Sequence, residues 1–98
     1  RYVRVGTVST TEPNADRYIK LYPNPATNSI NIELGEKLSG GHAYTIHCYD
    51  LLGRRCYTGV LPAYSYLHTI DVSALAPGMY FIEIVQNRQR VIQKFVRL

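Results

Sequence analysis

Residues 70–86, IDVSALAPGMYFIEIVQ, contain the pattern that decides the fold. Tyr80, Ile82 and Ile84 recur at every second position, so a β-strand places their side chains on one face. Pro77 and Gly78 precede this run and suit the two central positions of a type II turn, because proline presets φ and glycine accepts a positive φ. The stretch therefore predicts a turn that leads into a strand with one buried face.

The same alternation continues on both sides of this stretch and is interrupted by turn-forming residues. A helical period of 3.6 residues persists nowhere, although residues 73–76 have room for one helical turn. The expected strands are residues 18–22, 29–34, 43–50, 54–60, 66–72, 79–86 and 90–98. We therefore expect an all-β fold, an immunoglobulin-like antiparallel β-sandwich of about seven strands. Its core should contain Ile30, Ile32, Ile46, Tyr80, Ile82 and Ile84.

The 98 residues have room for one domain. Residues 2–8 alternate like a further short strand, whereas residues 9–17 are polar, contain Pro13 and lack periodicity, as linkers do. We place the boundary near Tyr18, with residues 1–17 as the end of a preceding segment and an exposed linker, and residues 18–98 as the domain. No run of about 20 apolar residues, the length of a membrane-spanning helix, occurs in the chain.

The positive charge is concentrated in the last 11 residues, where Arg88, Arg90, Lys94 and Arg97 occur without an acid and equal the net charge of +4. Such a terminus suits an acidic or membrane-proximal partner, or is a solvated strand whose charges discourage edge-to-edge aggregation. We expect replacement of Lys94 and Arg97 by glutamine to change stability by less than ~1 kcal/mol. Nucleic-acid binding requires exposed aromatic side chains among the cations. Only Phe95 stands beside them, so we expect no nucleic-acid partner.

Catalytic and metal sites have little support in the residue pattern. His47 and Cys48 are neighbours in an expected strand, so their side chains point to opposite faces and cannot form a base and nucleophile pair. Ser65, His68 and Asp71 could be combined into a catalytic triad, but the sequence has no glycine elbow or oxyanion loop that would support one. The cysteines and histidines fit no zinc spacing. We therefore expect no enzymatic activity and no cofactor.

The two cysteines flank an expected hairpin. Gly53 suits the left-handed position of a three-residue loop with a bulge, and Asp50 can accept hydrogen bonds from the backbone N–H groups of that loop. If Asp50 pairs with Arg54, Cys48 falls opposite Cys56 on the same face, close enough for a disulfide. The alternative is a pair of reduced cysteines that pack as small apolar side chains. The residues alone leave both alternatives open.

Four segments, taken in order, resemble a known family. They are LYPNPATN at 21–28 with Pro23, Asn24 and Pro25, DLLGRR at 50–55 with Asp50 and Gly53, IDVSALAPGMYFIEI at 70–84 with Pro77, Gly78 and Tyr80, and QKFVRL at 93–98. Their combination resembles the type IX secretion system (Por secretion) C-terminal sorting domains of Bacteroidetes. The resemblance covers about residues 18–98.

This resemblance implies a delivery role. Such a domain accompanies a covalently attached N-terminal passenger through the periplasm and engages the outer-membrane translocon. A surface sortase then removes the domain, here between Val8 and Tyr18, and the passenger stays at the cell surface or is secreted. The candidates for translocon recognition are Lys94, Phe95, Val96, Arg97 and Leu98. The alternative is an immunoglobulin-like adhesion or carbohydrate-binding module that remains attached to a surface protein.

Overall fold

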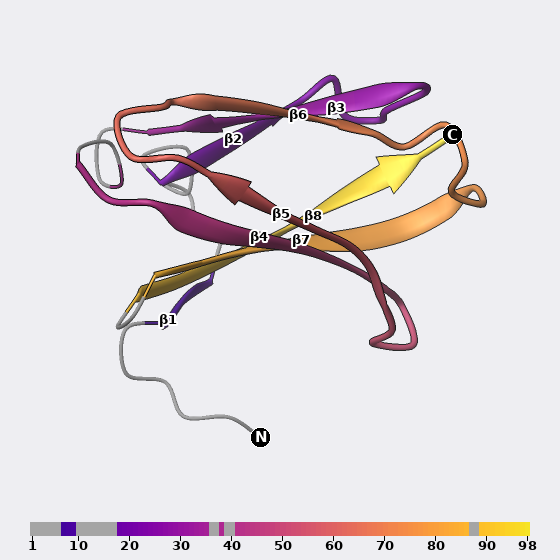
Figure 1. Ribbon diagram of the computed structural model, residues 1–98. Helices are drawn as coiled ribbons and strands as arrows, with labels where there is room; N and C mark the ends of the chain where they lie inside the picture. The colour runs from indigo at the N-terminus through magenta and orange to yellow at the C-terminus, as the bar shows by residue number, and fades with distance from the viewer. Residues whose placement is uncertain (1–6, 10–17, 36–37, 39–40, 87–88) are drawn as a thin grey trace.

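Strand β7 (Gly78–Gln86) lies at the centre of the larger of two sheets, and its alternating apolar residues Tyr80, Ile82 and Ile84 are buried. The structure, a computed structural model, describes residues 7–9, 18–35, 38, 41–86 and 89–98. The larger sheet has the order β1 (Thr7–Ser9), β8 (Gln89–Arg97), β7, β4 (Tyr44–Asp50) and β5 (Arg55–Leu61). The smaller sheet has the order β2 (Ile19–Tyr22), β3 (Ser29–Leu34) and β6 (Leu67–Asp71). The sheets stack face to face as a sandwich (Figure 1).

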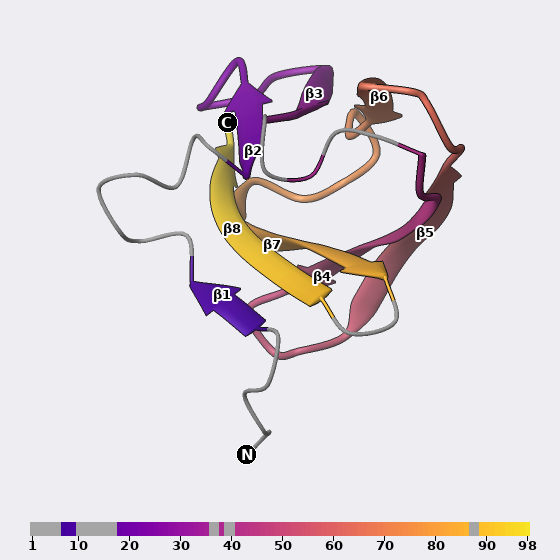
Figure 2. The same cartoon turned by 90° about the vertical axis from the view of Figure 1, so that its left-hand side faces the viewer.

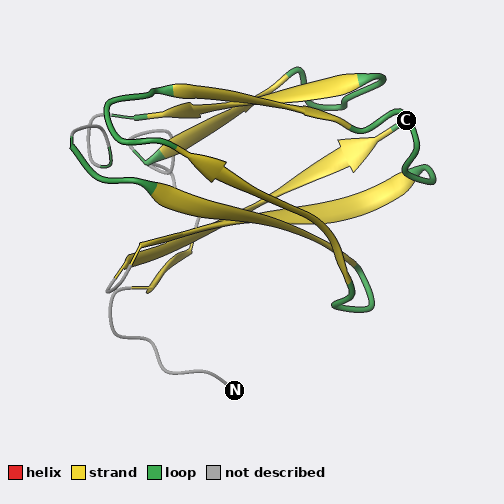
Figure 3. Ribbon diagram, viewed as in Figure 1, coloured by secondary structure: helices red, strands yellow, loops and turns green. Residues whose placement is uncertain are grey.

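Strands β2 to β8 confirm the seven expected strands, and they pair antiparallel within the two sheets. Strand β1 adds to the edge of β8 in parallel, with Thr7 opposite Arg90 (Figure 2). Residues 2–6 of the expected N-terminal strand lie outside the described residues. The part of the chain that the structure describes contains strands and loops but no helix (Figure 3). In place of the expected helical turn, residues 72–75 form a hydrogen-bonded turn, in which the Leu75 N–H donates to the Val72 carbonyl oxygen at 3.0 Å.

Alternate residues of each strand fill the space between the sheets. All the side chains that the sequence places in the core are buried: Ile30, Ile32, Ile46, Tyr80, Ile82 and Ile84. Phe95, Ala26 and Leu61 are also fully buried. Each large apolar side chain removed from water in this way contributes roughly 1.5–3 kcal/mol, so this layer holds the two sheets together.

Two glycines adopt backbone conformations that other residues rarely take. Gly53 has a φ of +83° in the three-residue loop between Asp50 and Arg54, which confirms the predicted hairpin. Gly78 has a φ of +151°, far from the about +80° of a type II turn, so the predicted turn type is wrong. The reason is that Gly78 is already the first residue of β7 and pairs with Arg97, which requires a more extended backbone than the turn allows.

The predicted register of the cysteines is also wrong. Cys48 lies opposite Tyr57, and Tyr49 lies opposite Arg55, so Cys56 is the extra residue of a β-bulge. Cys56 is exposed while Cys48 is buried in the core, and both are free thiols in this structure. The Cys56 thiol donates a hydrogen bond to the Cys48 carbonyl oxygen at 3.3 Å. A disulfide between the two cysteines in solution stays a prediction.

Candidate functional site

The four segments that the sequence analysis singled out meet at one end of the sandwich (Figure 1). The turn between β2 and β3, the hairpin between β4 and β5, the turn between β6 and β7 and the C-terminus all lie there, on the side away from β1. We call this the motif end and define it by residues 23–28, 50–54, 72–77 and 94–98. Segments far apart in the sequence therefore form one surface.

Backbone hydrogen bonds tie the first segment to the last. The Ala26 N–H donates to the Val96 carbonyl oxygen at 2.7 Å, and the Leu98 N–H donates to the Ala26 carbonyl oxygen at 2.9 Å. The Asn24 side-chain oxygen accepts from the Val96 N–H at 3.0 Å. Pro23 and Pro25, both preceded by cis peptide bonds, have no N–H to donate. The contacts to the terminal strand therefore come from Asn24 and Ala26.

Arg97 connects the terminal strand to the turn between β6 and β7. Its guanidinium donates from Nε to the Val72 carbonyl oxygen at 2.8 Å and from Nη2 to the Ser73 carbonyl oxygen at 2.9 Å. A third N–H bonds the Leu98 carbonyl oxygen. Arg97 is therefore not the solvated side chain that the sequence predicted, and we now expect it to contribute more to stability than the sequence indicated. The reason is that a charged donor bonded to backbone carbonyl oxygens stabilises far more than a solvated side chain. We call residues 24–26, 72–73 and 96–98 the C-terminal clasp.

Phe95 belongs to the core and not to the surface. It is fully buried and stacks on Tyr80, with ring centroids 5.6 Å apart and planes at 24°. The Tyr80 hydroxyl donates to the Ala76 carbonyl oxygen at 2.5 Å, which anchors the turn that contains Pro77. Of the five terminal candidates for recognition, Lys94, Val96 and Leu98 are exposed at the surface, with Leu98 60% exposed.

The hairpin tip, residues 50–54, is organised by one carboxylate. Asp50 Oδ1 accepts hydrogen bonds from the Leu52 and Arg54 N–H groups, each at 2.9 Å, and Oδ2 accepts from Arg54 Nε at 2.8 Å. The Arg54 backbone hydrogen bond is the main cause that lowers the pKa of Asp50. Leu51 and Leu52 project with 65% and 78% of their surface exposed. A hollow of about 200 Å³ separates the tip from the segment that contains Pro77. The prediction that Asp50 accepts hydrogen bonds from backbone N–H groups of this loop is confirmed.

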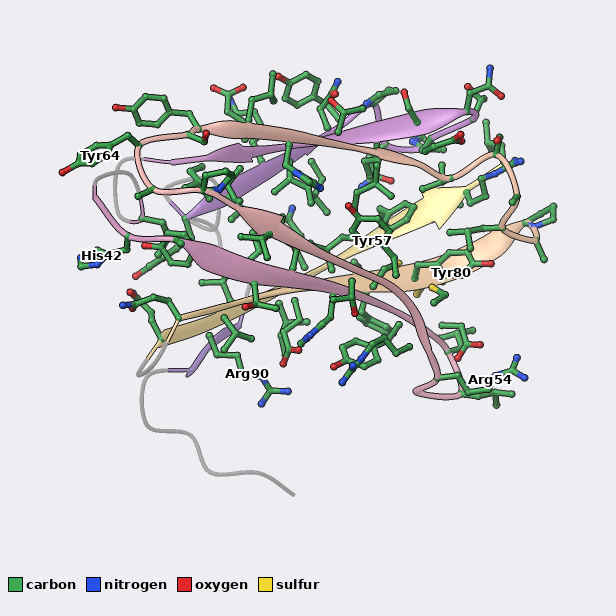
Figure 4. All side chains as sticks on the ribbon, in the orientation of Figure 1. His42, Arg54, Tyr57, Tyr64, Tyr80 and Arg90 are labelled. Carbon is green, nitrogen blue, oxygen red and sulfur yellow. The ribbon has the colours of Figure 1, made fainter. Side chains whose placement is uncertain are left out.

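A buried carboxylate lies on the outer face of the larger sheet. Glu83, only 5% exposed, accepts hydrogen bonds from the Tyr49 hydroxyl at 3.1 Å and from Arg90 Nε, and its Oε1 lies 2.9 Å from His47 Nδ1. Arg90 points outward, away from the smaller sheet (Figure 4). Burial alone raises the pKa of Glu83, but the hydrogen bonds from His47 and Arg90 outweigh it and bring the pKa below its ordinary value. Sequence reasoning missed this cluster, because His47, Glu83 and Arg90 meet only through strand pairing.

The residues considered for catalysis have other partners. His68 Nε2 bonds the Tyr57 hydroxyl at 2.7 Å across the two sheets, and burial lowers the pKa of His68. Asp71 accepts hydrogen bonds from the N–H and the hydroxyl of Ser73. Among the described residues, no group of three or more His, Cys, Asp or Glu side chains could hold a metal ion. The described part of the chain also has no helix long and apolar enough to cross a membrane.

Comparisons with known proteins support both the fold and the motifs. Residues 20–97 match the profile of a family described as the secretion system C-terminal sorting domain. Among solved structures, the chain is similar to a DUF3244 family protein from Bacteroides vulgatus, described as having an immunoglobulin-like β-sandwich fold. The two are 17% identical with a TM-score of 0.69, over 85% of this chain and 86% of the other. This likeness shows the fold and confirms the predicted sandwich. No curated protein matches the chain.

Proposed function

The chain belongs to the family of secretion system C-terminal sorting domains, and from that premise we propose that residues 18–98 carry an attached N-terminal passenger through the periplasm and across the outer membrane by way of the type IX translocon. Membership implies export to the cell surface or secretion. We further propose that a surface sortase then removes the domain by cutting between Val8 and Tyr18. The domain itself performs no chemistry in this proposal.

The observation that carries the proposal is the convergence of the family motifs at the motif end. Fold stability alone does not require all four to lie at one end, because the core layer already joins the sheets. In the C-terminal clasp, hydrogen bonds of Asn24, Ala26 and Arg97 hold the last strand in place. We infer that these residues position the terminal strand for its receptor.

The signal in this proposal is a folded surface and not a linear tail. Phe95 is fully buried against Tyr80, so a receptor could grip the last five residues as an extended peptide only by opening the core. The residues left for direct contact are Lys94, Val96 and Leu98, which are exposed at the surface.

The experiment distinguishes side chains that the translocon recognises from side chains that stabilise the fold. The double variant Lys94→Gln/Leu98→Ser removes a cation and an exposed apolar side chain and keeps the hydrogen bonds of the clasp, because Leu98 contributes only backbone atoms to them. The matched control Lys20→Gln/Leu67→Ser changes an exposed lysine and a 52% exposed leucine on the smaller sheet. Both precursors should unfold at wild-type denaturant concentrations. We expect the first precursor to accumulate in the periplasm with residues 18–98 attached, and the control to reach the surface.

Two results would count against the proposal. Normal secretion of Lys94→Gln/Leu98→Ser would show that these side chains are not read. Mature surface passenger that retains the whole domain would instead favour an immunoglobulin-like adhesion or carbohydrate-binding module, because such a module functions while attached.

A further inference from the structure

The outer face of the larger sheet carries a row of side chains that crosses four strands. Arg55 on β5 lies opposite Tyr49 on β4, Tyr49 lies opposite Phe81 on β7, and Phe81 lies opposite Lys94 on β8. Residues directly opposite on neighbouring strands share a face. Two aromatic side chains therefore stand between two cations, and we call these four residues the cation–aromatic row.

The charge on this face is one-sided. Within the described parts of β4, β5, β7 and β8, the exposed charged side chains of the outer face are Arg55 and Lys94. The acid on this face, Glu83, is buried and bonded to Arg90, His47 and Tyr49, so it does not neutralise the row. Asp50, at the edge of the face, is bonded to Arg54. The exposed charge of this face is therefore positive.

A hollow of about 330 Å³ lies next to the row, lined by Tyr49, Leu51, Phe81 and Glu83 among others. Its volume is at the lower end of the ~300–1,000 Å³ of ligand sites, and apolar walls of this kind favour an apolar group. Leu51, at 65% exposed, forms a wall that reaches over from the hairpin tip. The hollow thus offers an apolar seat beside Tyr49 and Phe81, the two aromatic residues of the row, and Asp50, Glu83 and Arg90 also contribute to its lining.

We propose that the cation–aromatic row binds an extended acidic segment of a partner protein, with one apolar side chain in the hollow and an acid paired to each of Arg55 and Lys94. The two cations are three strand spacings apart, roughly 14 Å at the usual ~4.8 Å per spacing. Residues i and i+4 of an extended peptide are roughly 13 Å apart, and residue i+2 faces the same side. The recognised pattern is acid-x-apolar-x-acid. This inference does not rest on the sorting function.

An anionic lipid surface fits the same face less well. Recruitment to such a surface typically needs about 4–8 clustered cations, whereas the row has Arg55 and Lys94 at opposite ends with half-buried rings between them. The placement of the two charges at opposite ends of one row favours a peptide, because a peptide places its acids at fixed intervals and a lipid surface does not.

The probe is a fluorescein-labelled peptide, Gly-Ser-Glu-Thr-Phe-Thr-Glu-Ser-Gly, titrated with the full chain and followed by fluorescence anisotropy. Control peptides replace both Glu by Lys, or Phe by Ser. Protein variants are Arg55→Glu/Lys94→Glu, the single Lys94→Glu, and the matched control Lys20→Glu on the smaller sheet, each checked by its denaturant midpoint. A parallel arm uses phosphatidylglycerol vesicles in place of the peptide.

We expect the Glu peptide to bind the wild-type chain. Its affinity should fall about tenfold in Arg55→Glu/Lys94→Glu, severalfold in Lys94→Glu and less than about twofold in Lys20→Glu. Both control peptides should bind more weakly than the probe. The amide resonances of Tyr49 and Phe81 should shift on titration, while that of Asn31, on β3 of the smaller sheet, should not. Absence of binding, equal binding of the Lys peptide, or equal loss in Lys20→Glu would overturn the proposal. Binding to the vesicles without binding to the peptide would assign the face to a lipid surface instead.

Discussion

The C-terminal clasp and the hairpin tip lie at the same end of the sandwich, but different kinds of contact hold them. The tip depends on residues within one short segment, since the Asp50 carboxylate accepts hydrogen bonds from Leu52 and Arg54. The clasp joins segments more than twenty residues apart, through Asn24 to Val96 and Arg97 to Val72. Local contacts can be predicted from the sequence, whereas long-range contacts depend on how the strands stack. The difference also separates side chains that hold the fold from side chains free to be recognised.

The largest expected effect contrasts a buried residue beside the clasp with an exposed one at the tip. Phe95→Ala removes a fully buried ring that stacks on Tyr80 and should destabilise the domain by about 3–5 kcal/mol. Leu52→Ala, at a position 78% exposed, should change stability by less than ~0.5 kcal/mol. Urea unfolding followed by tyrosine fluorescence measures both. Similar losses at the two positions would mean that Phe95 is not a core residue in solution.

The next effect separates two cations in the terminal strand. Arg97→Gln loses charge-assisted hydrogen bonds to Val72 and Ser73 and should cost about 1.5–3 kcal/mol, the range for bonds to charged groups. Lys94→Gln, on an exposed side chain, should cost less than ~0.5 kcal/mol. Arg97→Lys should recover little, because an ammonium lacks the planar fork that spans two carbonyl oxygens. Equal denaturant midpoints for Arg97→Gln and Lys94→Gln would show that the clasp does not depend on Arg97.

The two glycines allow a backbone comparison between the hairpin tip and the start of β7, where Gly78 pairs with the clasp residue Arg97. Gly53→Asn should cost less than ~1 kcal/mol, because asparagine tolerates the left-handed conformation near +83°. Gly78→Asn should cost about 1–3 kcal/mol, because a φ of +151° lies in a region that is essentially confined to glycine. No atom lies within 4 Å of a Cβ added at either site, so backbone strain alone decides the outcome. Thermal unfolding compares the two variants, and an equal cost would indicate that Gly78 relaxes into an extended conformation.

A smaller effect concerns the pH dependence of the hairpin tip. Hydrogen bonding to Arg54 lowers the pKa of Asp50 from its ordinary 3.8, so the carboxylate stabilises the folded state above pH 3.8. This contribution is lost as the pH falls through the lower folded-state pKa. Asp50→Asn should therefore be less stable than wild type at pH 7 and should lose less stability on acidification. Denaturant midpoints between pH 7 and pH 2 measure this, and parallel curves for the two proteins would contradict it.

The smallest expected effect concerns the cysteines beside the tip. Burial is the first cause that raises the pKa of the Cys48 thiol, whereas Cys56 is exposed. Iodoacetamide should therefore label Cys56 in the folded, reduced protein and label Cys48 only after unfolding. The variant Cys56→Ser is the control, and equal labelling of both thiols in folded protein would contradict the burial of Cys48. In unreduced protein, the absence of labelling at both sites after unfolding would instead demonstrate the disulfide.

The architecture was predictable because two-residue periodicity is a local property. Alternating Tyr80, Ile82 and Ile84 must face one side in any strand, and all three are buried in the sandwich. The same holds for Gly53 and Asp50, whose loop is complete within one hairpin. The type of the turn at Gly78 was not predictable, because the pairing of Gly78 with Arg97 alters the backbone that Pro77 and Gly78 would adopt by themselves.

The sequence by itself determined the strands, the hairpin and the presence of four family motifs, since each depends on neighbours within a few residues. Only the tertiary structure decided that the motifs meet at one end, that Arg97 is tied to backbone carbonyl oxygens, and that Lys94 stands in a row with Phe81 and Tyr49. Sequence distance does not record which strands become neighbours. The stacking of the sheets sets those neighbours, because burial of the alternating apolar faces leaves one low-energy arrangement in which all the strands pair.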